Sequence, residues 1–149
     1  MTAANQEGAP FEIHVDEAAG IIRTVLRGFW TLDDLHAFGR GMFEAVGRVA
    51  RRHAVFALMS DSSAFKIQSA EVGDAFAKMM EQGNRAHTGP TAIVVGSRLN
   101  KLQAERLFGD PNVRVFIDAD EARGWVDAEL AAAVEQAANA SLTSVDWTP

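Results

Sequence analysis

Apolar and polar residues alternate in two short segments near the start of the chain. Residues 11–15 place apolar side chains at odd positions with polar ones between them, and residues 21–27 also alternate. A period of two is typical of half-buried β-strands. Because the linker 16–20 is short and contains a glycine, the two segments are predicted to form an antiparallel hairpin.

The pattern changes to a helical period after Gly28. Residues 31–34 have the Ser/Thr-x-x-Asp/Glu form of a capping box, which predicts a helix start at Thr31. The helix is expected to continue to about Arg51, because apolar residues recur every three or four positions at Leu35, Phe38, Met42, Val46 and Val49.

Strands and helices then alternate to the end of the chain. Continuous apolar runs at 54–59 and 91–95 are typical of strands covered on both faces, and 113–117 forms the fifth strand. A polar loop is expected over 60–68. The remaining helices are predicted from Ser69 to near Gly83, after Gly96-Ser97, and from Asp118–Glu121 to about Ala138.

This order of elements favours an α/β fold. Strands that alternate with helices pair in parallel through crossovers, so only the first hairpin should be antiparallel. The sequence therefore predicts one domain over 11–138, with a mixed five-stranded sheet and four helices. We expect a flexible arm over 1–10 and a tail over 139–149.

Composition and charge argue against several classes of function. The chain has 149 residues, a net charge of −6 and no cysteine, which excludes thiolate chemistry and disulfides. An acidic chain is a poor partner for nucleic acid, whose binding needs a basic surface. The sequence contains no apolar run of membrane-spanning length and no signal-peptide pattern, so we expect a cytoplasmic protein.

Two segments in the C-terminal half of the chain are similar to a known protein family. Residues 113–126, with the string Val-Arg-Val-Phe-Ile-Asp-Ala-Asp-Glu-Ala-Arg-Gly-Trp-Val, and residues 96–106 resemble the STAS superfamily, whose fold is often called SpoIIAA-like. The resemblance spans about Phe11 to Val126 and is greatest to small bacterial members. It implies a binding module, because family members act in anti-sigma-factor switches, in anion transporters, or in assemblies that sense nucleotides or lipids.

The resemblance also implies a phosphorylation site. Switch proteins of the family carry Asp-Ser-Ser-Gly at the start of the second helix and are phosphorylated on a serine there. In this chain Asp61, Ser62 and Ser63 match the first three residues, but Ala64 replaces the glycine, whereas the position of the motif falls on Ser69. These serines are candidate phosphate acceptors or ligand contacts; the alternatives are an ordinary turn for the first pair and a helix cap for Ser69.

Two other positions could contact a ligand or partner. Ser97, with Arg98, stands at a strand–helix junction where an anion can bind, or simply caps the helix. Trp30 either lines the rim of a pocket or partner surface, or packs on the first helical turn as a hydrophobic staple.

No catalytic or metal-binding motif stands out. The histidines have no paired metal-ligand spacing, and the P-loop and nucleophile-elbow patterns do not occur. A hydrolase would need a trio such as Ser62, His53 and Asp61 to come together. Asp118, Asp120 and Glu121 are expected to cap a helix.

The sequence thus favours a non-catalytic regulatory or binding module without a cofactor or metal. It would bind a protein partner or a small apolar or anionic ligand, most simply through the loop 60–69. One alternative is an apolar-ligand carrier with a cavity of about 300 Å³ or more between sheet and helices, lined by residues such as Phe38, Met42 and Phe76. Others are a small hydrolase, and a homodimer formed through the alanine-rich last helix or around Trp147.

Overall fold

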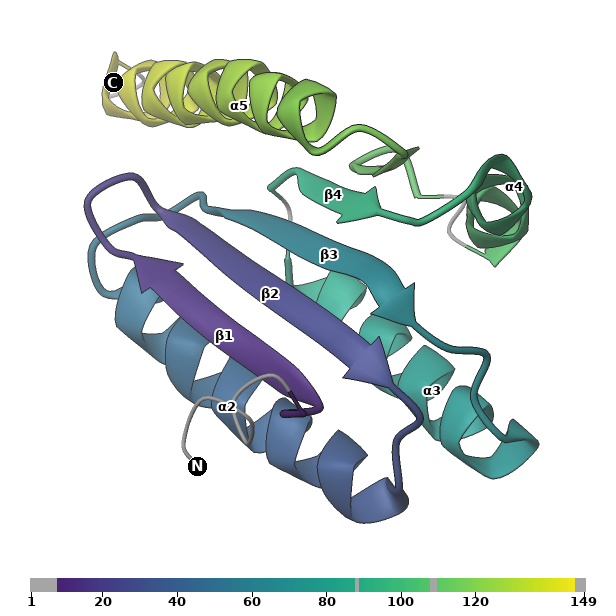
Figure 1. Ribbon diagram of the computed structural model, residues 1–149. Coiled ribbons are helices and arrows are strands. Elements are labelled where there is room, and N and C mark those ends of the chain that lie inside the picture. The colour runs from purple at the N-terminus through teal and green to yellow at the C-terminus, as the bar shows by residue number, and fades with distance from the viewer. Residues whose placement is uncertain (1–7, 88, 108–109, 147–149) are drawn as a thin grey trace.

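The structure, a computed structural model, describes residues 8–87, 89–107 and 110–146 (Figure 1). Its elements follow the predicted order from hairpin to last helix. In chain order they are β1 (Phe11–Asp16), β2 (Ile21–Gly28), α2 (Leu32–Ala50), β3 (Ala57–Phe65), α3 (Ala70–Ala86), β4 (Thr91–Val94), α4 (Arg98–Leu107), β5 (Val113–Phe116) and α5 (Ala119–Asp146).

The five strands form one mixed sheet in the order β1-β2-β3-β4-β5. Strands β1 and β2 pair antiparallel, and every other neighbouring pair is parallel. The predicted fold class, an α/β domain with this mixed sheet and four helices, is confirmed for the described residues.

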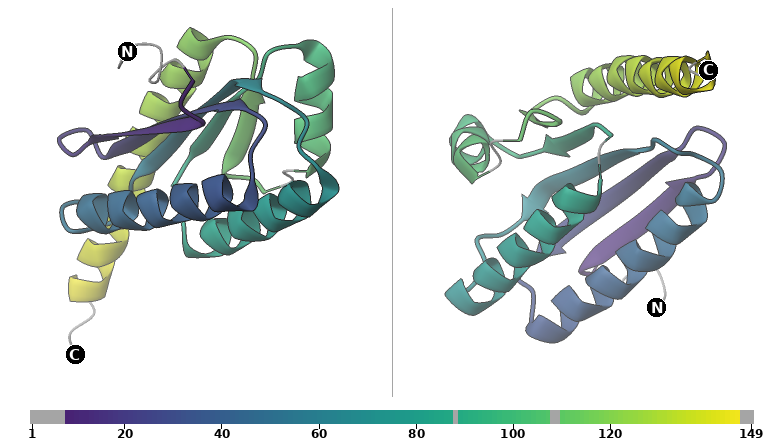
Figure 2. Two further views of the ribbon diagram at one scale, coloured as in Figure 1. Left: turned by 60° about the horizontal axis from the view of Figure 1, so that its bottom comes forward. Right: turned by 180° about the vertical axis from the view of Figure 1, so that it is seen from behind.

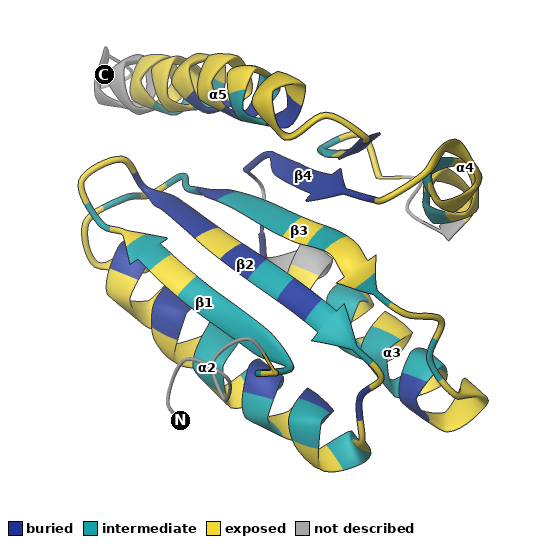
Figure 3. Cartoon of the chain, in the orientation of Figure 1, coloured by how far each residue is buried: buried dark blue, intermediate teal, exposed yellow. Residues whose placement is uncertain are grey.

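The helices form layers on both faces of the sheet. Helices α2 and α3 lie on one face, and α5 lies across the other (Figures 1 and 2). Helix α4 packs beside β5, where Ala104 contacts the cluster of Ile93, Val95 and Val115. Strand β4, between the layers, is buried along its whole length (Figure 3).

Apolar clusters on both faces of the sheet hold these layers together. On the α5 side, Ala122, Val126 and Leu130 pack on strand residues such as Ile21 and Phe116. On the opposite face an aromatic cluster joins both helices to the sheet, and its buried members are Leu26, Trp30, Leu35, Phe38 and Val72.

Strand β3 is displaced from its predicted position. The sequence predicted a strand over 54–59 and a loop over 60–68, but the strand spans Ala57–Phe65. The backbone of Ser60 pairs with both Thr24 and Ile93, which come from neighbouring strands on either side. Because the ladder uses main-chain groups, polar side chains can occupy a strand wherever one of its faces is open to solvent.

Helix α5 is longer than predicted. It continues to Asp146 instead of ending near Ala138. Alanine has the highest intrinsic helix propensity, so the segment 131–140 has no residue that would stop the helix. Within the part of the chain that the structure describes, no helix is long and apolar enough to cross a membrane.

Candidate functional site

The four helices that the structure describes all begin at the same edge of the sheet, where the parallel strands end. Each start is capped by a side chain. Thr31 and Asp34 form the predicted capping box of α2, and Ser69 Oγ accepts a hydrogen bond from Val72 N at 3.3 Å. Ser97 Oγ accepts from Asn100 N at 3.1 Å at the start of α4.

The start of α5 is capped in the same way. Asp118 Oδ1 accepts hydrogen bonds from the backbone N–H groups of Asp120 at 2.7 Å and Glu121 at 3.1 Å. The predicted capping roles of Asp118, Ser69 and Ser97 are therefore confirmed. These caps fix the loops between strands and helices in defined positions.

The serines of the family-like motif lie at the end of β3. Asp61 Oδ1 accepts hydrogen bonds from Ser63 N at 3.0 Å and from Ser63 Oγ at 2.6 Å. Ser60 and Ser62 hydroxyls lie 3.3 Å apart on the same strand. Asp61 and Ser63 are exposed and Ser62 is half-buried, so the hydroxyl of Ser63 is open to solvent while its proton is held by a carboxylate.

Trp30 belongs to the core. Its side chain is 5% exposed and contacts the rings of Phe11, Phe38, Phe65 and Phe76, with centroids between 4.9 and 5.9 Å away. The indole Nε1 donates hydrogen bonds to two backbone carbonyls, at 3.1 and 3.2 Å. This burial favours the packing interpretation over the alternative in which Trp30 rims a surface pocket.

Sequence reasoning missed the main feature of this edge. A large exposed apolar residue follows each of the four parallel strands within a few positions. Phe29 is 74% exposed after β2 and Ile67 83% after β3; Leu99 is 65% exposed after β4 and Ile117 43% after β5. The signal available in the sequence was an apolar residue placed among polar cap and loop residues, as at Ile67.

The loops that carry Phe29 and Ile67 are joined by hydrogen bonds. Lys66 N donates to the Gly28 carbonyl at 3.1 Å. Gln68 bridges the same loops, since its Oε1 accepts from Trp30 N at 2.7 Å and its Nε2 donates to the Gly28 carbonyl at 2.9 Å. Phe29 and Ile67 therefore lie on two loops that are hydrogen-bonded to each other.

The loop after β4 also lies close to the end of β3. A Cβ atom at Gly96 would lie 3.0 Å from the Ser63 carbonyl oxygen, so the turn after β4 approaches the end of β3 directly. This end of the sheet thus carries capped loops, each with an exposed apolar side chain. We call this surface, defined by Phe29, Ile67, Leu99 and Ile117, the carboxyl edge.

The hydrolase trio does not come together. His53 lies before β3, at the opposite end of that strand from Ser62, and its Nε2 bonds to the Glu17 carbonyl at 2.6 Å. Ala57 and Ser62 are five residues apart in one strand, or about 16 Å at 3.3 Å per residue. His53 therefore cannot act as the base for this serine in the observed arrangement.

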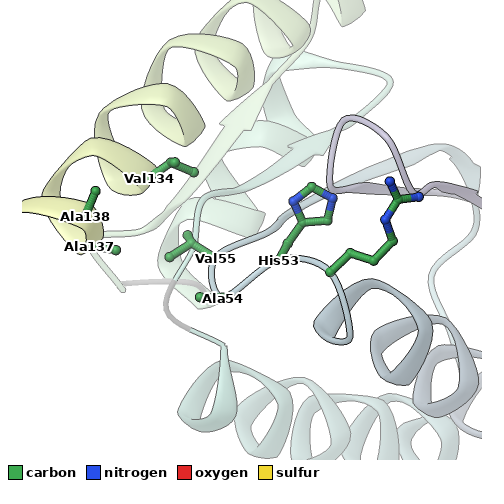
Figure 4. Close-up of a pocket in the computed structure, with 7 residues that line it drawn as sticks. His53, Ala54, Val55, Val134, Ala137 and Ala138 are labelled. Atoms are coloured by element: carbon green, nitrogen blue, oxygen red, sulfur yellow. The ribbon is translucent and has the colours of Figure 1, made fainter. Parts of the chain in front are cut away.

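Two hollows lie away from the carboxyl edge. One of about 310 Å³ lies between the α2–β3 connection, with His53 and Val55, and the α5 residues Val134, Ala137 and Ala138 (Figure 4). The other, of about 400 Å³, runs between α2 and α3 beside Gly39. Neither is lined by residues of the sheet, whereas the carrier hypothesis expects a cavity between sheet and helices.

Among the described residues, His87 and Glu12 have shifted pKa values. Burial lowers the pKa of His87, whose Nε2 has no hydrogen-bond partner among the described residues, as is also true of Thr91 Oγ1. Hydrogen bonds from Arg27 and then His14 lower the pKa of Glu12. No group of three or more potential metal ligands lies together in the described parts of the chain.

Comparison with protein-family models and with curated proteins finds no match to this chain.

Proposed function

We propose that this chain is a non-catalytic binding module that docks a protein partner along its carboxyl edge. One observation carries the proposal: each parallel strand is followed by a large apolar side chain that is exposed to solvent. Carboxyl ends of strands are the usual binding edge of open α/β sheets.

The chemistry of this edge suits a protein surface. The fully buried parts of protein interfaces are apolar, and exposed apolar side chains gathered in one region mark such contacts. Here the polar rim would come from neighbours such as Asp61, Ser63 and Lys66, which are exposed.

The caps and loop contacts support tight binding. Ser69, Ser97 and Gln68 hold the loops in place before any partner arrives. Loops that are ordered in advance lose less conformational entropy on association, so more of the contact free energy remains as affinity.

This proposal agrees with the role implied by the STAS resemblance, in which members act through partners. A phosphorylated Ser62, Ser63 or Ser69 would then place two negative charges within the docking surface and regulate it.

The test compares partner capture by matched variants. Phe29→Ser with Ile67→Ser removes two apolar contacts, each contributing about 1.5–3 kcal/mol when fully buried, so capture should fall at least about tenfold. Phe43→Ser is the control, because Phe43 on α2 is as exposed as Ile67, at 83% each, but lies outside the edge.

Captured proteins are identified by quantitative mass spectrometry after each bait is incubated with an extract of its own cells. A protein retained by the wild type and the control but lost from the double variant supports the proposal. Capture that is equal for all three baits contradicts it. Native and denatured mass spectra of the purified chain report a bound small molecule or a phosphate-sized increment.

A further inference from the structure

The two edges of the sheet differ in how they are protected from pairing with another chain. Strand β5 has only four residues, Val113–Phe116, includes the exposed Arg114, and has α4 packed beside it. Strand β1 has six residues, Phe11–Asp16, in unbroken register with β2. It contains the charged residues Glu12 and Asp16, but no proline, no lysine and no bulge, which are among the devices that usually prevent edge pairing.

Every second residue of β1 directs its backbone N–H and C=O groups away from β2. Arg27 N donates to the Pro10 carbonyl at 2.8 Å, which makes residues 10 and 27 a hydrogen-bonded pair. In an antiparallel ladder, hydrogen-bonded pairs alternate with non-hydrogen-bonded pairs. The N–H and C=O groups of residues 12, 14 and 16 therefore point toward β2. The outward groups therefore belong to Phe11, Ile13 and Val15, and the described part of the chain supplies no hydrogen-bond partner for them.

A second β1 strand fits this pattern when the two strands run antiparallel with a two-fold axis at Ile13. Phe11 of one copy then pairs with Val15 of the other, and Ile13 pairs with Ile13. Phe11, Ile13 and Val15 are the outward-facing residues, so each of these pairs can exchange backbone hydrogen bonds.

The charges favour this register over the two adjacent ones. With the axis at Ile13, Glu12 lies opposite His14 of the second copy in a non-hydrogen-bonded pair, where side chains approach most closely. Moving the axis to Glu12 places two glutamates opposite each other. Moving it to His14 places Glu12 opposite Asp16 of the second copy, which is repulsive as well.

We propose that a second copy of this chain pairs with β1 along its free edge, in the register centred on Ile13, so that the two sheets join into one. The arrangement is isologous, because the same strand supplies both sides of the contact. It uses a surface other than the carboxyl edge and is independent of the proposed function.

The first test measures association of the full chain by analytical ultracentrifugation across a concentration series. His14→Glu places two like-charged pairs across the axis, and we expect it to weaken association about tenfold. The variant should still fold, because His14 is exposed and Arg23, which lies opposite it in the hairpin, offsets the repulsion between the new glutamate and Glu12 on the same strand. His14→Gln, which introduces no repulsion, should weaken association much less.

The second test follows amide hydrogen exchange residue by residue by NMR. In the dimer the amides of Phe11, Ile13 and Val15 should be protected, and this protection should decrease on dilution. The amides of Glu12 and His14, which bond to β2, should be protected at every concentration.

Three outcomes would overturn the proposal. The first is a chain that stays monomeric across the series. The second is a dimer that is unaffected by His14→Glu and has rapidly exchanging outward amides, which would point to another surface such as α5. The third is protection of the outward amides in a monomeric chain.

Discussion

The side chain of Gln68 is hydrogen-bonded to the backbone of Trp30. Its Oε1 accepts from Trp30 N at 2.7 Å, while its Nε2 donates to the carbonyls of Gly28 at 2.9 Å and Lys66 at 2.6 Å. One amide therefore satisfies backbone groups in the two loops that carry Phe29 and Ile67, beside a buried indole.

Replacing this amide should destabilise the fold. Gln68→Ala leaves the half-buried Trp30 N–H without its partner, which we expect to lower the free energy of unfolding by about 1–3 kcal/mol. Urea unfolding followed by tryptophan fluorescence measures the change. Gln103→Ala on the exposed side of α4 is the control and should change stability by less than about 0.5 kcal/mol. Equal effects of the two variants would show that the Gln68 bridge contributes little.

Stability should decrease in mild acid because of His87. Its pKa is lowered by burial, so at pH values below its unfolded pKa the unfolded chain binds a proton more readily than the folded chain. The contribution of His87 to the free energy of unfolding is therefore fully present above its unfolded pKa of about 6.5. It is lost as the pH falls from there toward the lower pKa of the folded state.

The measurement compares urea unfolding of the wild type and His87→Gln between pH 5 and pH 8. The wild type should lose more stability on acidification than the variant, which has no imidazole to protonate. His36→Gln, at an exposed position on α2, should keep the dependence that His87 causes. A wild-type curve parallel to that of His87→Gln would exclude this role of His87.

Two glycines should respond oppositely to alanine. A Cβ atom at Gly89 would lie 1.9 Å from the Phe56 carbonyl oxygen, so Gly89→Ala must displace backbone next to the buried β4 strand. We expect a loss of about 1–3 kcal/mol or more. At Gly83, in helix α3, a Cβ would meet no atom within 4 Å, and Gly83→Ala should stabilise the chain by about 0.5–1 kcal/mol.

Thermal unfolding of both glycine variants distinguishes these effects by sign. The midpoint should fall for Gly89→Ala and rise for Gly83→Ala. A Gly89→Ala variant as stable as the wild type would show that the turn before β4 can move away from Phe56.

Alanine substitutions should separate the structural role of Ser69 from that of Ser63. Ser69→Ala removes the N-cap of α3 and should cost about 1 kcal/mol. Ser63 is exposed, and within the described parts of the chain its hydroxyl bonds to the exposed Asp61, so Ser63→Ala should change the free energy of unfolding by less than about 0.5 kcal/mol. Urea denaturation measures both; a larger loss for Ser63→Ala than for Ser69→Ala would reverse the assignment.

Features that depend on neighbouring residues were predictable from the sequence. The capping box of Thr31 and Asp34 lies within four residues, and the caps at Ser69 and Asp118 are equally local. The alternation in 11–15 and 21–27 likewise predicted the hairpin.

Features that depend on distant partners were not predictable. The polar end of β3 becomes a strand because Thr24 and Ile93 lie beside Ser60, which no local pattern encodes. The burial of Trp30 requires Phe65 and Phe76 from later elements. The exposure of Ile67 was missed because an apolar residue by itself suggests burial.

The first part of helix α5 packs more closely against the rest of the protein than its second part. Its 28 residues extend about 42 Å at 1.5 Å per residue, while β4 and β5 span four residues each. Among the α5 side chains that the structure describes, those of residues 119–140, the last buried one is Leu130, and over 131–140 every side chain is half-buried or exposed. The second part should therefore open at a free energy well below that of global unfolding. A protease would find its earliest cleavage sites there and leave the sheet and its layers intact.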